Sequence, residues 1–586
     1  MQIKSEKAIS RRSLMTGAAA GGAVAAVGAL TLPGAEAKAA RNWNHDADIV
    51  VVGSGAAGLT AAVTAALNKD DVIVLEKASD PGGTCAKSGG VFWIPNHFGL
   101  RENGVVDARE ACLRYLARYS YPEIYTEKSP TLGLPPETFA LLEAFYDNAG
   151  PMVDRVREAG ALKVVQWKLT HLDKLPPDYF DHAPENKVPR GRSLAAQGAD
   201  GNPAPGVEII AQFEDALDRA GVPILFEHPA HRLILNEAGE VIGLQALHEG
   251  RSVNLKARKG VIFATGGFAH SLPLIERMQG GRIYGSCAAS TATGDFVPIA
   301  EAVGARLANM SAAWRTEVVL EQVLEYREMG RAAFMPAGDS MIQVNRYGRR
   351  VVNEKRNYND RTEIHFAYDP TNAEYPNHFM YTIYDRRTAE AYAGNNTLPS
   401  TPTGASHVIT GETLDDLAMA IQDRLASLAP AIGDVRLDPD FARTLKDSVA
   451  RFNGFARKGI DPDFGRGAQA YDREWTHYFA PQRDTTNWSP NPMPNITMHP
   501  LDEKGPYYAI IVAPGVLDTN GGPVINQAAQ VLNYEDKAIP GLYGAGNCVA
   551  SPTREAYFGA GATIGLAMTF GFIAANSAHK EKPKAM

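Results

Sequence analysis

The segment 557–565, near the C-terminal end, combines small residues with one large phenol. It reads Tyr-Phe-Gly-Ala-Gly-Ala-Thr-Ile-Gly, and the similarly small run Gly-Leu-Tyr-Gly-Ala-Gly-Asn occupies 541–547. Glycine and alanine let backbone N–H groups approach a flat or phosphorylated ligand closely. Few of the neighbouring residues are large enough to bury the ring of Tyr557. We therefore expect a ligand-binding loop that carries Tyr557.

A dinucleotide-binding fingerprint lies near the other end of the chain. The apolar run Asp48–Val52 predicts a buried parallel strand, and a Gly-x-Gly-x-x-Gly motif leads from it into the predicted helix Leu59–Leu67. Val72–Leu75 predicts the next strand, which is followed by Glu76. The motif consists of Gly53, Ser54, Gly55, Ala56, Ala57 and Gly58.

Each part of this fingerprint has a physical role. Gly53 makes the tight turn, Gly55 lets the backbone approach a pyrophosphate, and Gly58 lets the helix pack closely on the sheet. The helix N-terminus offers unpaired N–H groups to the phosphates. Glu76 can accept hydrogen bonds from the ribose hydroxyls. The pattern predicts a doubly wound α/β domain, with both ends of the chain closing on one cofactor.

FAD and NAD share this fingerprint, and three further motifs favour FAD. The run Gly82–Gly90 follows Glu76 closely, as in flavoproteins whose isoalloxazine ring lies along this loop. Ala264–Gly267 resembles the second glycine strand end of such proteins, and Gly544–Asn547 resembles the late motif that holds their ribityl chain. The four motifs in this order predict FAD.

Later apolar runs predict further strands of the same sheet. They are Val222–Phe226, Val241–Leu244, Gly260–Ala264, Tyr508–Val512 and Gly541–Tyr543. Residues 309–494 differ in composition, being richer in Arg, Tyr, Asn and Pro, and contain amphipathic stretches at 412–428 and 440–457. We expect an inserted domain at 309–494, so that the FAD-binding domain comprises residues 46–308 and 495–578.

Three segments resemble one superfamily of flavoproteins. Gly82–Pro95 matches a GGT–SGG–W-x-P pattern, Asn353–Tyr358 resembles an N-E-x3-Y segment, and Tyr557–Phe570 resembles a long Y-x-G-x-G-A-T-I-G-x-A-M-T-F motif. These patterns are typical of 3-ketosteroid Δ1-dehydrogenases, within the fumarate-reductase/ketosteroid-dehydrogenase superfamily. The likeness extends over residues 46–578. It implies a Rossmann-like FAD domain interrupted by an α+β domain that caps the substrate.

The resemblance implies desaturation next to a ketone, in which a base takes the α-proton and the β-hydride passes to the flavin N5. The Tyr557 hydroxyl and the Gly561 N–H would polarise the ketone, because its α-proton is otherwise too weakly acidic. Tyr358 would accept that proton, supported by Tyr179. A phenol has an unperturbed pKa of about 10, so nearby charge must assist Tyr358. The candidates for that charge are Arg356, Lys355 and Arg361.

The resemblance also implies the rest of the FAD site. Besides the fingerprint, its expected residues are Glu76, Lys77, Gly83, Thr84, Ser88, Gly89, Gly90, Ala230, Ala264, Thr265, Gly266, Gly294, Asp295, Gly546, Asn547, Ala562, Thr563 and Ile564. The loop after Gly83 holds no histidine before His97, so we expect noncovalent binding. The reduced flavin would need an external electron acceptor, a quinone or a redox carrier.

Other functions of the superfamily remain open. Reductases of dicarboxylates use histidine and arginine, whereas Leu517–Gly522 holds no histidine and Tyr557 stands about where their arginine does. Fumarate reduction is therefore disfavoured, and reduction of another activated C=C, such as an enone or enoate, is the alternative. Lys87 and Phe558–Ala560 depart from the ketosteroid pattern, so a smaller cyclic ketone, such as a cyclohexanone, also fits. The tyrosines, and the lack of a haem CxxCH motif, argue against a simple electron carrier.

Residues 1–37 have the features of a twin-arginine signal peptide. Ser10–Met15 contains the arginine pair, Gly17–Leu32 is uncharged and rich in small residues, and Ala35–Ala37 offers a cleavage site. The run is too short and too rich in glycine to span a bilayer comfortably. We expect a periplasmic enzyme without an integral membrane segment in its mature chain.

Charge and cysteine content exclude several classes of partner. The chain of 586 residues has a formal net charge of −8, and its first 37 residues carry a net positive charge, so the mature part is more acidic still. This balance does not favour nucleic acid or an anionic membrane as a partner. The 4 cysteines are scattered, with no CxxC or Cys/His cluster, so no metal site is predicted.

Overall fold

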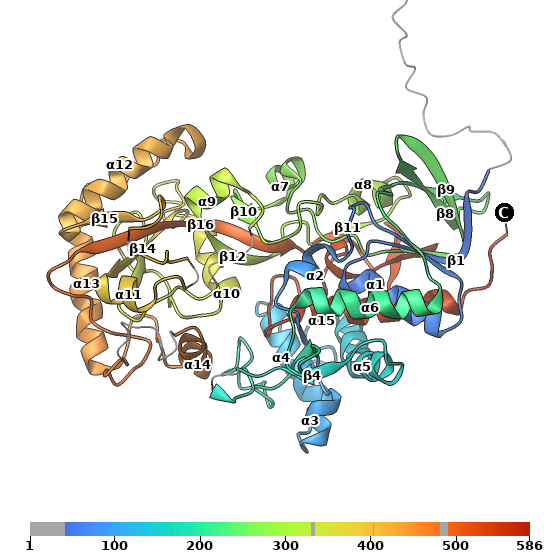
Figure 1. Ribbon diagram of the computed structural model, residues 1–586, viewed down its shortest axis with the longest axis horizontal. Coiled ribbons are helices and arrows are strands. Elements are labelled where there is room, and N and C mark those ends of the chain that lie inside the picture. The colour runs from blue at the N-terminus through green and yellow to red at the C-terminus, as the bar shows by residue number, and fades with distance from the viewer. Residues whose placement is uncertain are drawn as a thin grey trace, which may run out of the picture. The chain divides into compact units, whose positions relative to one another are not determined.

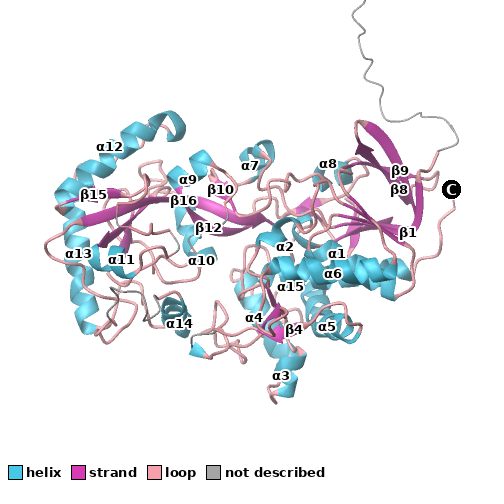
Figure 2. Cartoon of the chain, in the orientation of Figure 1, coloured by secondary structure: helices cyan, strands magenta, loops and turns pink. Residues whose placement is uncertain are grey.

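The computed structural model describes residues 42–169, 172–329, 334–395, 397–401, 403–480 and 490–585. The predicted signal peptide, residues 1–37, lies outside these ranges. Residues Trp43–Met586 form one compact unit, which contains two large sheets (Figures 1 and 2).

The first sheet is the predicted doubly wound sheet, with the order β18-β19-β9-β1-β2-β6 and an antiparallel β7–β8 pair attached to β9. Strands β19, β9, β1, β2 and β6 are parallel. The predicted strands at 48–52, 72–75, 222–226, 241–244, 260–264 and 541–543 are thus confirmed. The bounds are β1 (His45–Val52), β2 (Val72–Leu75), β6 (Ile224–Leu225), β7 (Ala230–Leu235), β8 (Val241–His248), β9 (Arg251–Phe263), β18 (Gln530–Leu532) and β19 (Ala538–Gly544).

Three helices pack together beside this sheet (Figure 2): α1 (Ala56–Leu67), α6 (Gly206–Ala220) and α15 (Ala562–His579). Helix α15 is buried almost all round, which explains why its sequence is apolar on every face. A Cβ atom at Gly571 would lie 2.3 Å from the Ala57 carbonyl oxygen. Glycine at position 571 therefore permits the close approach of α1 and α15. Through this contact an early segment of the chain packs against a late one.

The second sheet is built around one long strand, β16 (Tyr507–Thr519). In Figure 1 this orange strand lies among green and yellow strands from the middle of the chain. Antiparallel β12, β14 and β15 and parallel β10 pair with β16, and β13 pairs with β14. The bounds are β10 (Gly285–Ser286), β12 (Ala313–Val319), β13 (Met341–Val344), β14 (Met380–Asp385) and β15 (Ile409–Gly411).

The prediction that Tyr508–Val512 returns to the first sheet is wrong, because these residues pair with β14 and β12 of the second sheet. An apolar run shows that a strand is buried but does not show which strand it pairs with. The domain boundaries at 309 and 494 stay predictions. The amphipathic stretches at 412–428 and 440–457 form helices α12 (Leu414–Ile432) and α13 (Phe441–Lys458), as their period suggests.

The remaining elements connect these layers. A small sheet contains β3 (Val91–Trp93), β4 (Val164–Gln166) and β5 (Ser193–Ala196), and a two-stranded one contains β11 (Leu307–Ala308) and β17 (Gly522–Pro523). The other helices are α2 (Gly83–Lys87), α3 (Phe98–Glu102), α4 (Arg109–Ser120), α5 (Pro136–Glu158), α7 (Leu272–Met278), α8 (Phe296–Glu301), α9 (Leu320–Glu325), α10 (Tyr358–Thr362), α11 (Arg386–Ala391), α14 (Ala470–Tyr478) and the 3₁₀ turns Glu363–Phe366 and Gly546–Cys548. Within the described ranges, every helix is too short or too polar to cross a bilayer.

Candidate active site

A cavity of about 730 Å³ opens at the carboxyl ends of β1, β2 and β9. Ligands of doubly wound sheets bind at this edge. The cavity wall contains the predicted cofactor residues except Gly58, Gly294 and Ala562. Gly58 has the packing role expected of it, because a Cβ there would lie 1.9 Å from the Gly53 carbonyl oxygen.

The glycines around the cavity leave room for a dinucleotide. Gly53 has a φ of +104°, and a Cβ there would meet the Ala264 carbonyl oxygen at 2.5 Å. A Cβ at Gly83 or Gly89 would meet no atom within 4 Å, so these two glycines border open space. The Thr265 hydroxyl is buried without a hydrogen-bond partner in the described part of the chain. The open space beside these glycines and the unpaired Thr265 hydroxyl suit a large polar ligand.

Glu76 is held in place by the turn that follows β1. The Ser54 N–H and hydroxyl donate to Glu76 Oε2 at 3.0 and 2.6 Å, and the Ala78 N–H donates to Oε1 at 2.9 Å. Beside it, Lys77 Nζ lies 2.8 Å from Asp295 Oδ2. Both carboxylates belong to the cavity wall. The structure thus brings together three of the predicted cofactor-binding residues, Glu76, Lys77 and Asp295, at the cavity wall.

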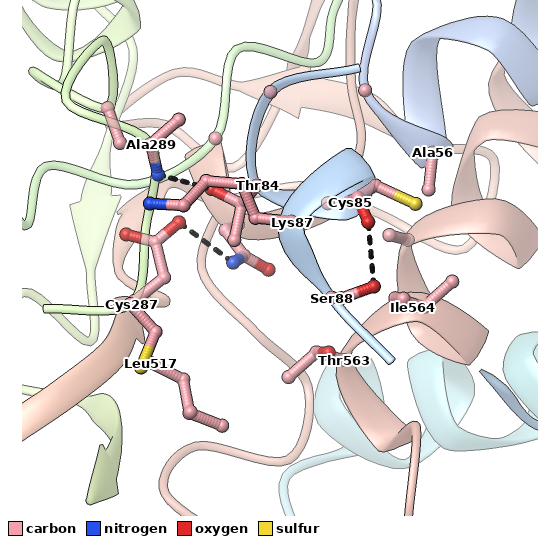
Figure 3. A pocket seen from close by; sticks show the side chains of 18 of the residues that line it. Ala56, Thr84, Cys85, Lys87, Ser88, Cys287, Ala289, Leu517, Thr563 and Ile564 are labelled. Carbon is pink, nitrogen blue, oxygen red and sulfur yellow. Dashed lines mark hydrogen bonds between the residues drawn. The ribbon is translucent and has the colours of Figure 1, made fainter. Parts of the chain in front are cut away.

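The loop that carries α2 is fixed to the segment that follows β10 (Figure 3). The Ala289 N–H donates to the Thr84 hydroxyl at 3.1 Å, and the Ser88 hydroxyl donates to the Cys85 carbonyl at 2.7 Å. Lys87 forms an ion pair with Glu328. The residues around Gly83–Gly90 therefore form a preformed floor rather than an open loop.

Asp518 is a wall residue that sequence reasoning did not assign to the site. Strand β16 carries it into the cavity, where Asn547 Nδ2 and the Gly267 N–H each donate to Asp518 Oδ2 at 2.9 Å. Burial raises its pKa to about 6, against the lowering effect of these hydrogen bonds. The sequence signal for Asp518 was its position in the segment 517–522, where dicarboxylate reductases of the superfamily carry histidine.

Three tyrosines from distant segments meet at the wall of the same cavity. The rings of Tyr179 and Tyr557 stack at 5.3 Å, and Tyr358 packs edge-on against both, at 5.4 Å from Tyr179 and 5.5 Å from Tyr557. The Tyr179 hydroxyl donates to the Tyr358 hydroxyl at 3.0 Å. All three are buried and line the cavity together with Gly561. The structure thus brings together the four predicted catalytic residues.

Gly561 caps the N-terminus of α15 with a φ of +89°. A Cβ there would lie 2.3 Å from the Val91 carbonyl oxygen. Only glycine suits this backbone conformation and this contact. The residue is therefore held at the cavity wall by the close approach of the helix to β3.

The buried ion pair of Asp178 and Arg192 supports Tyr179. Asp178 accepts a hydrogen bond from Arg192 Nη1 and another, at 2.8 Å, from Trp93 Nε1. Arg192 also donates to both carboxylate oxygens of Asp107, each at 2.8 Å. The Tyr179 N–H donates to the Phe558 carbonyl at 2.9 Å. Backbone and side-chain hydrogen bonds thus hold the segment that carries Tyr179.

The cations expected to assist Tyr358 contact other groups. Lys355 donates to the Pro336 carbonyl and, at 2.6 Å, to the Gly338 carbonyl. Arg356 lies 3.2 Å from Asp472 and donates to the Tyr179 carbonyl, and Arg361 lies 3.1 Å from Glu317. The pKa of Tyr358 is raised well above 10, first by burial and then by the neighbouring phenols. The expectation that a cation lowers this pKa is therefore wrong.

Aromatic side chains form the wall next to the tyrosines, and the sequence analysis missed them. The signal was the spacing of large rings at i, i+3 and i+4 over 475–479, which places them on neighbouring parts of α14. Asn395 lies beside them and donates to the Phe479 carbonyl. The aromatic wall residues are Trp167, Phe334, Trp475, Tyr478 and Phe479.

Charge in the cavity is sparse. Within the described part of the chain, the lysine and arginine side chains of the wall are Lys77 and Lys87, and each is paired with a carboxylate. A dicarboxylate would need unpaired cations at its binding site. The same residue ranges contain no group of three His, Cys, Asp or Glu side chains arranged to hold a metal ion.

Comparison with known proteins shows what this architecture resembles. The family model described as "FAD binding domain" matches residues 48–564. The chain is 32% identical to 4-oxocyclohexanecarboxylate 2-dehydrogenase of Sinomonas cyclohexanicum, over 90% of this chain and 92% of the other. It is also 32% identical to 3-oxosteroid 1-dehydrogenase of Mycolicibacterium smegmatis, over 90% and 96%.

Among solved structures, a similar one is the 3-ketosteroid Δ1-dehydrogenase of Sterolibacterium denitrificans in complex with 1,4-androstadiene-3,17-dione. The TM-score is 0.73 at 24% sequence identity, and the match covers 92% of this chain and 100% of that chain. At this identity the comparison shows a shared fold.

Proposed function

The chain belongs to the FAD binding domain family of flavoprotein oxidoreductases, and on this premise we propose that it desaturates a cyclic ketone between the α- and β-carbons. The observation that carries the proposal is the contact of Tyr179, Tyr358 and Tyr557 beside Gly561 in the cofactor cavity. Its cofactor is FAD, and we propose that binding is noncovalent, since the sequence after Gly83 holds no histidine before His97.

Tyr557 and Gly561 polarise the ketone in this proposal. A phenol O–H and a backbone N–H, both at the cavity wall, donate to the carbonyl oxygen and stabilise the negative charge that develops there. Such donors act strongly in a low-dielectric environment and need no reorganisation during the reaction, and the Tyr557 side chain is buried. Bound FAD supplies the acceptor for the β-hydride.

Tyr358 accepts the α-proton. A neutral phenol is too weak a base for this step, so Tyr358 first loses its own hydroxyl proton to solvent and acts as the phenolate. Its pKa, raised by burial, keeps the phenolate a minor form, and polarisation of the ketone assists the step by lowering the pKa of the α-carbon. The hydrogen bond from Tyr179 stabilises the oxygen of Tyr358 as a proton acceptor. Tyr179 is thus a positioning residue that orients the base.

We propose a compact ring ketone rather than a steroid as the substrate, because Lys87 and Phe558–Ala560 depart from the ketosteroid pattern. The cavity of about 730 Å³ must hold this substrate together with FAD. Two relatives act, by their names, on 4-oxocyclohexanecarboxylate and on 3-oxosteroids. The alternative function, reduction of an activated C=C, uses the same residues in reverse. Fumarate itself is disfavoured by the paired state of Lys77 and Lys87.

Anaerobic titration of the purified yellow protein tests the proposal. We expect a cyclohexanone-type ketone to bleach the flavin absorbance, with a 3-ketosteroid as the larger comparison substrate. The proposal fails if no ketone bleaches the flavin and only an enoate such as fumarate reoxidises the reduced protein. Product analysis by mass spectrometry would show the loss of two hydrogen atoms from the ketone.

We further propose twin-arginine export to the periplasm and transfer of electrons to a quinone or a redox carrier. The support for export is the sequence of residues 10–37. In a variant with Arg11 and Arg12 changed to lysine, export should fail, so the enzyme activity should be found in the cytoplasm. Unchanged periplasmic activity in that variant would contradict export by this route.

A further inference from the structure

Lys87 is a charged residue of the cavity wall whose ion pair contributes little to the stability of the fold. It is the last residue of α2, and its amine pairs with Glu328, which follows α9 and lies outside the wall. The two side chains are 29% and 35% exposed. Ion pairs of this kind stabilise a protein weakly, because water and salt screen them. The charge of Lys87, however, also acts on whatever the cavity holds.

Hydrogen bonds hold both charges in place. Lys87 Nζ also donates to the Ala288 carbonyl at 3.3 Å, and the Ser290 N–H donates to Glu328 Oε2 at 2.9 Å. Burial alone would raise the pKa of Glu328, but the hydrogen bonds from Lys87 and Ser290 lower it. Glu328 is therefore ionised at neutral pH. The lysine cation thus borders the cavity, and its counter-ion lies outside the wall.

The chain brings Lys87 close to the reacting residues. Four positions separate Lys87 from Val91, whose carbonyl oxygen would lie 2.3 Å from a Cβ at Gly561. Four residues span at most about 14 Å. Hydride transfer requires contact between the flavin and the ketone that Gly561 binds in the proposed function. The reacting part of the flavin therefore lies on the side of the cavity where Lys87 stands, next to Thr84 and Ala289 (Figure 3).

Reduction gives the flavin a negative charge. Hydride transfer brings two electrons and one proton to the neutral ring system, which becomes an anion. A nearby cation stabilises that anion and raises the reduction potential of the flavin, whereas a nearby carboxylate lowers it. Of the two lysines in the described part of the wall, Lys77 and Lys87, the second is nearer in the chain to Val91. Its charge is therefore placed to act on the reduced flavin.

We propose that the Lys87–Glu328 ion pair sets the reduction potential of the bound flavin. Lys87 raises the potential, and Glu328 limits the rise. The inference rests on the proposed function and deepens it, because a higher potential favours transfer of the β-hydride from the ketone to the flavin. The reverse reaction, reduction of a C=C bond by the flavin, is disfavoured to the same extent. Both residues act through their charge.

The reduction potential of the FAD-bound protein tests this inference without any substrate. The protein is reduced slowly under anaerobic conditions together with a reference dye, and the absorbances of flavin and dye give the potential at a fixed pH. We expect Lys87→Met to lower the potential, since Glu328 is left unpaired. Glu328→Gln should raise it, since Lys87 is left unpaired. Each shift should correspond to about a three- to tenfold change in the equilibrium between oxidised and reduced flavin, or about 14 to 30 mV for two electrons.

Further variants separate the effect of charge from that of structure. Lys87→Arg keeps the cation and should keep the wild-type potential. The double variant Lys87→Met/Glu328→Gln removes both charges, so its potential should lie between those of the two single variants. Lys446→Met is the matched control, because Lys446 pairs with Asp415 at 2.9 Å outside the cavity wall, and it should leave the potential unchanged. If Lys87→Met does not retain FAD, the sign of the shift in Glu328→Gln decides.

Equal potentials in the wild-type protein, Lys87→Met and Glu328→Gln overturn the inference. Shifts of the same sign in the two variants, or a similar shift in Lys446→Met, overturn it as well. These outcomes concern the ion pair alone, because no ketone is present. The proposed function is judged separately, by whether a ketone bleaches the flavin.

Discussion

The Tyr179 hydroxyl donates a hydrogen bond to the Tyr358 hydroxyl across 3.0 Å. The two residues are 179 positions apart, and their rings meet edge to face at 5.4 Å. This contact gives the proposed base a neutral donor, because the nearby Lys355 and Arg356 contact other groups. The hydrogen bond from Tyr179 therefore stabilises the phenolate form of Tyr358, which is the form that can accept the α-proton.

Replacing Tyr358 by phenylalanine removes the proposed proton acceptor. We expect kcat to fall by about 10²- to 10⁴-fold, the usual contribution of a general base, with an unchanged flavin spectrum. The measurement is steady-state turnover with an artificial electron acceptor. Tyr534→Phe is a suitable control, since Tyr534 is 70% exposed. Near-normal turnover in Tyr358→Phe would remove this residue from the mechanism.

Replacing Tyr557 by phenylalanine removes one donor to the ketone but leaves the Gly561 N–H. The expected loss in kcat is about 10²- to 10³-fold, as for a single donor of an oxyanion hole. The rate of anaerobic flavin bleaching, followed by stopped flow, reports the chemical step directly. If bleaching keeps its rate and only KM rises, Tyr557 binds the substrate without stabilising the developing charge.

Asp518 should make the stability of the protein depend on pH in a defined way. Its pKa is about 6 in the folded protein against an ordinary value of 3.8, because it is buried. Between these values the folded state holds more protons than the unfolded state, so this group's contribution to the free energy of unfolding decreases as pH rises. The contribution is present below about pH 4 and is lost by the time the pH has risen past about 6.

Asp518→Asn has no proton to lose over that range. The melting temperature of Asp518→Asn minus that of the wild-type protein should therefore increase between pH 4 and pH 7. The new amide can shift this difference by a constant amount at every pH, so the test is how the difference changes with pH. Thermal unfolding of both FAD-bound proteins at several pH values measures this difference. A difference that stays constant with pH would show that Asp518 titrates normally.

Replacing Gly571 by alanine should weaken cofactor binding from a distance. The new Cβ would lie 2.3 Å from the Ala57 carbonyl oxygen and push α15 away from α1, so both halves of the site shift. We expect a raised dissociation constant for FAD, measured by the release of flavin fluorescence. Gly454→Ala is the matched control, because it also lies in a helix, and its Cβ would meet no atom within 4 Å.

The sequence predicted the first sheet well because its strands are local apolar runs next to glycine motifs. The same reasoning assigned Tyr508–Val512 to the wrong sheet, since pairing between distant strands leaves no mark in a local pattern. The tyrosines were found through motif resemblance. Trp167 and Trp475 were not, because their proximity depends on how α14 packs against a loop from another part of the chain.

The packing of α1 against α15 also has a consequence for biogenesis. Translation completes β1 and α1 early, whereas the segment from β19 to α15, which contains Gly546, Asn547 and Tyr557, is made much later. A nascent chain that lacks this segment therefore holds only part of the flavin site. Tight retention of FAD thus requires that α15 has been made and has packed against α1.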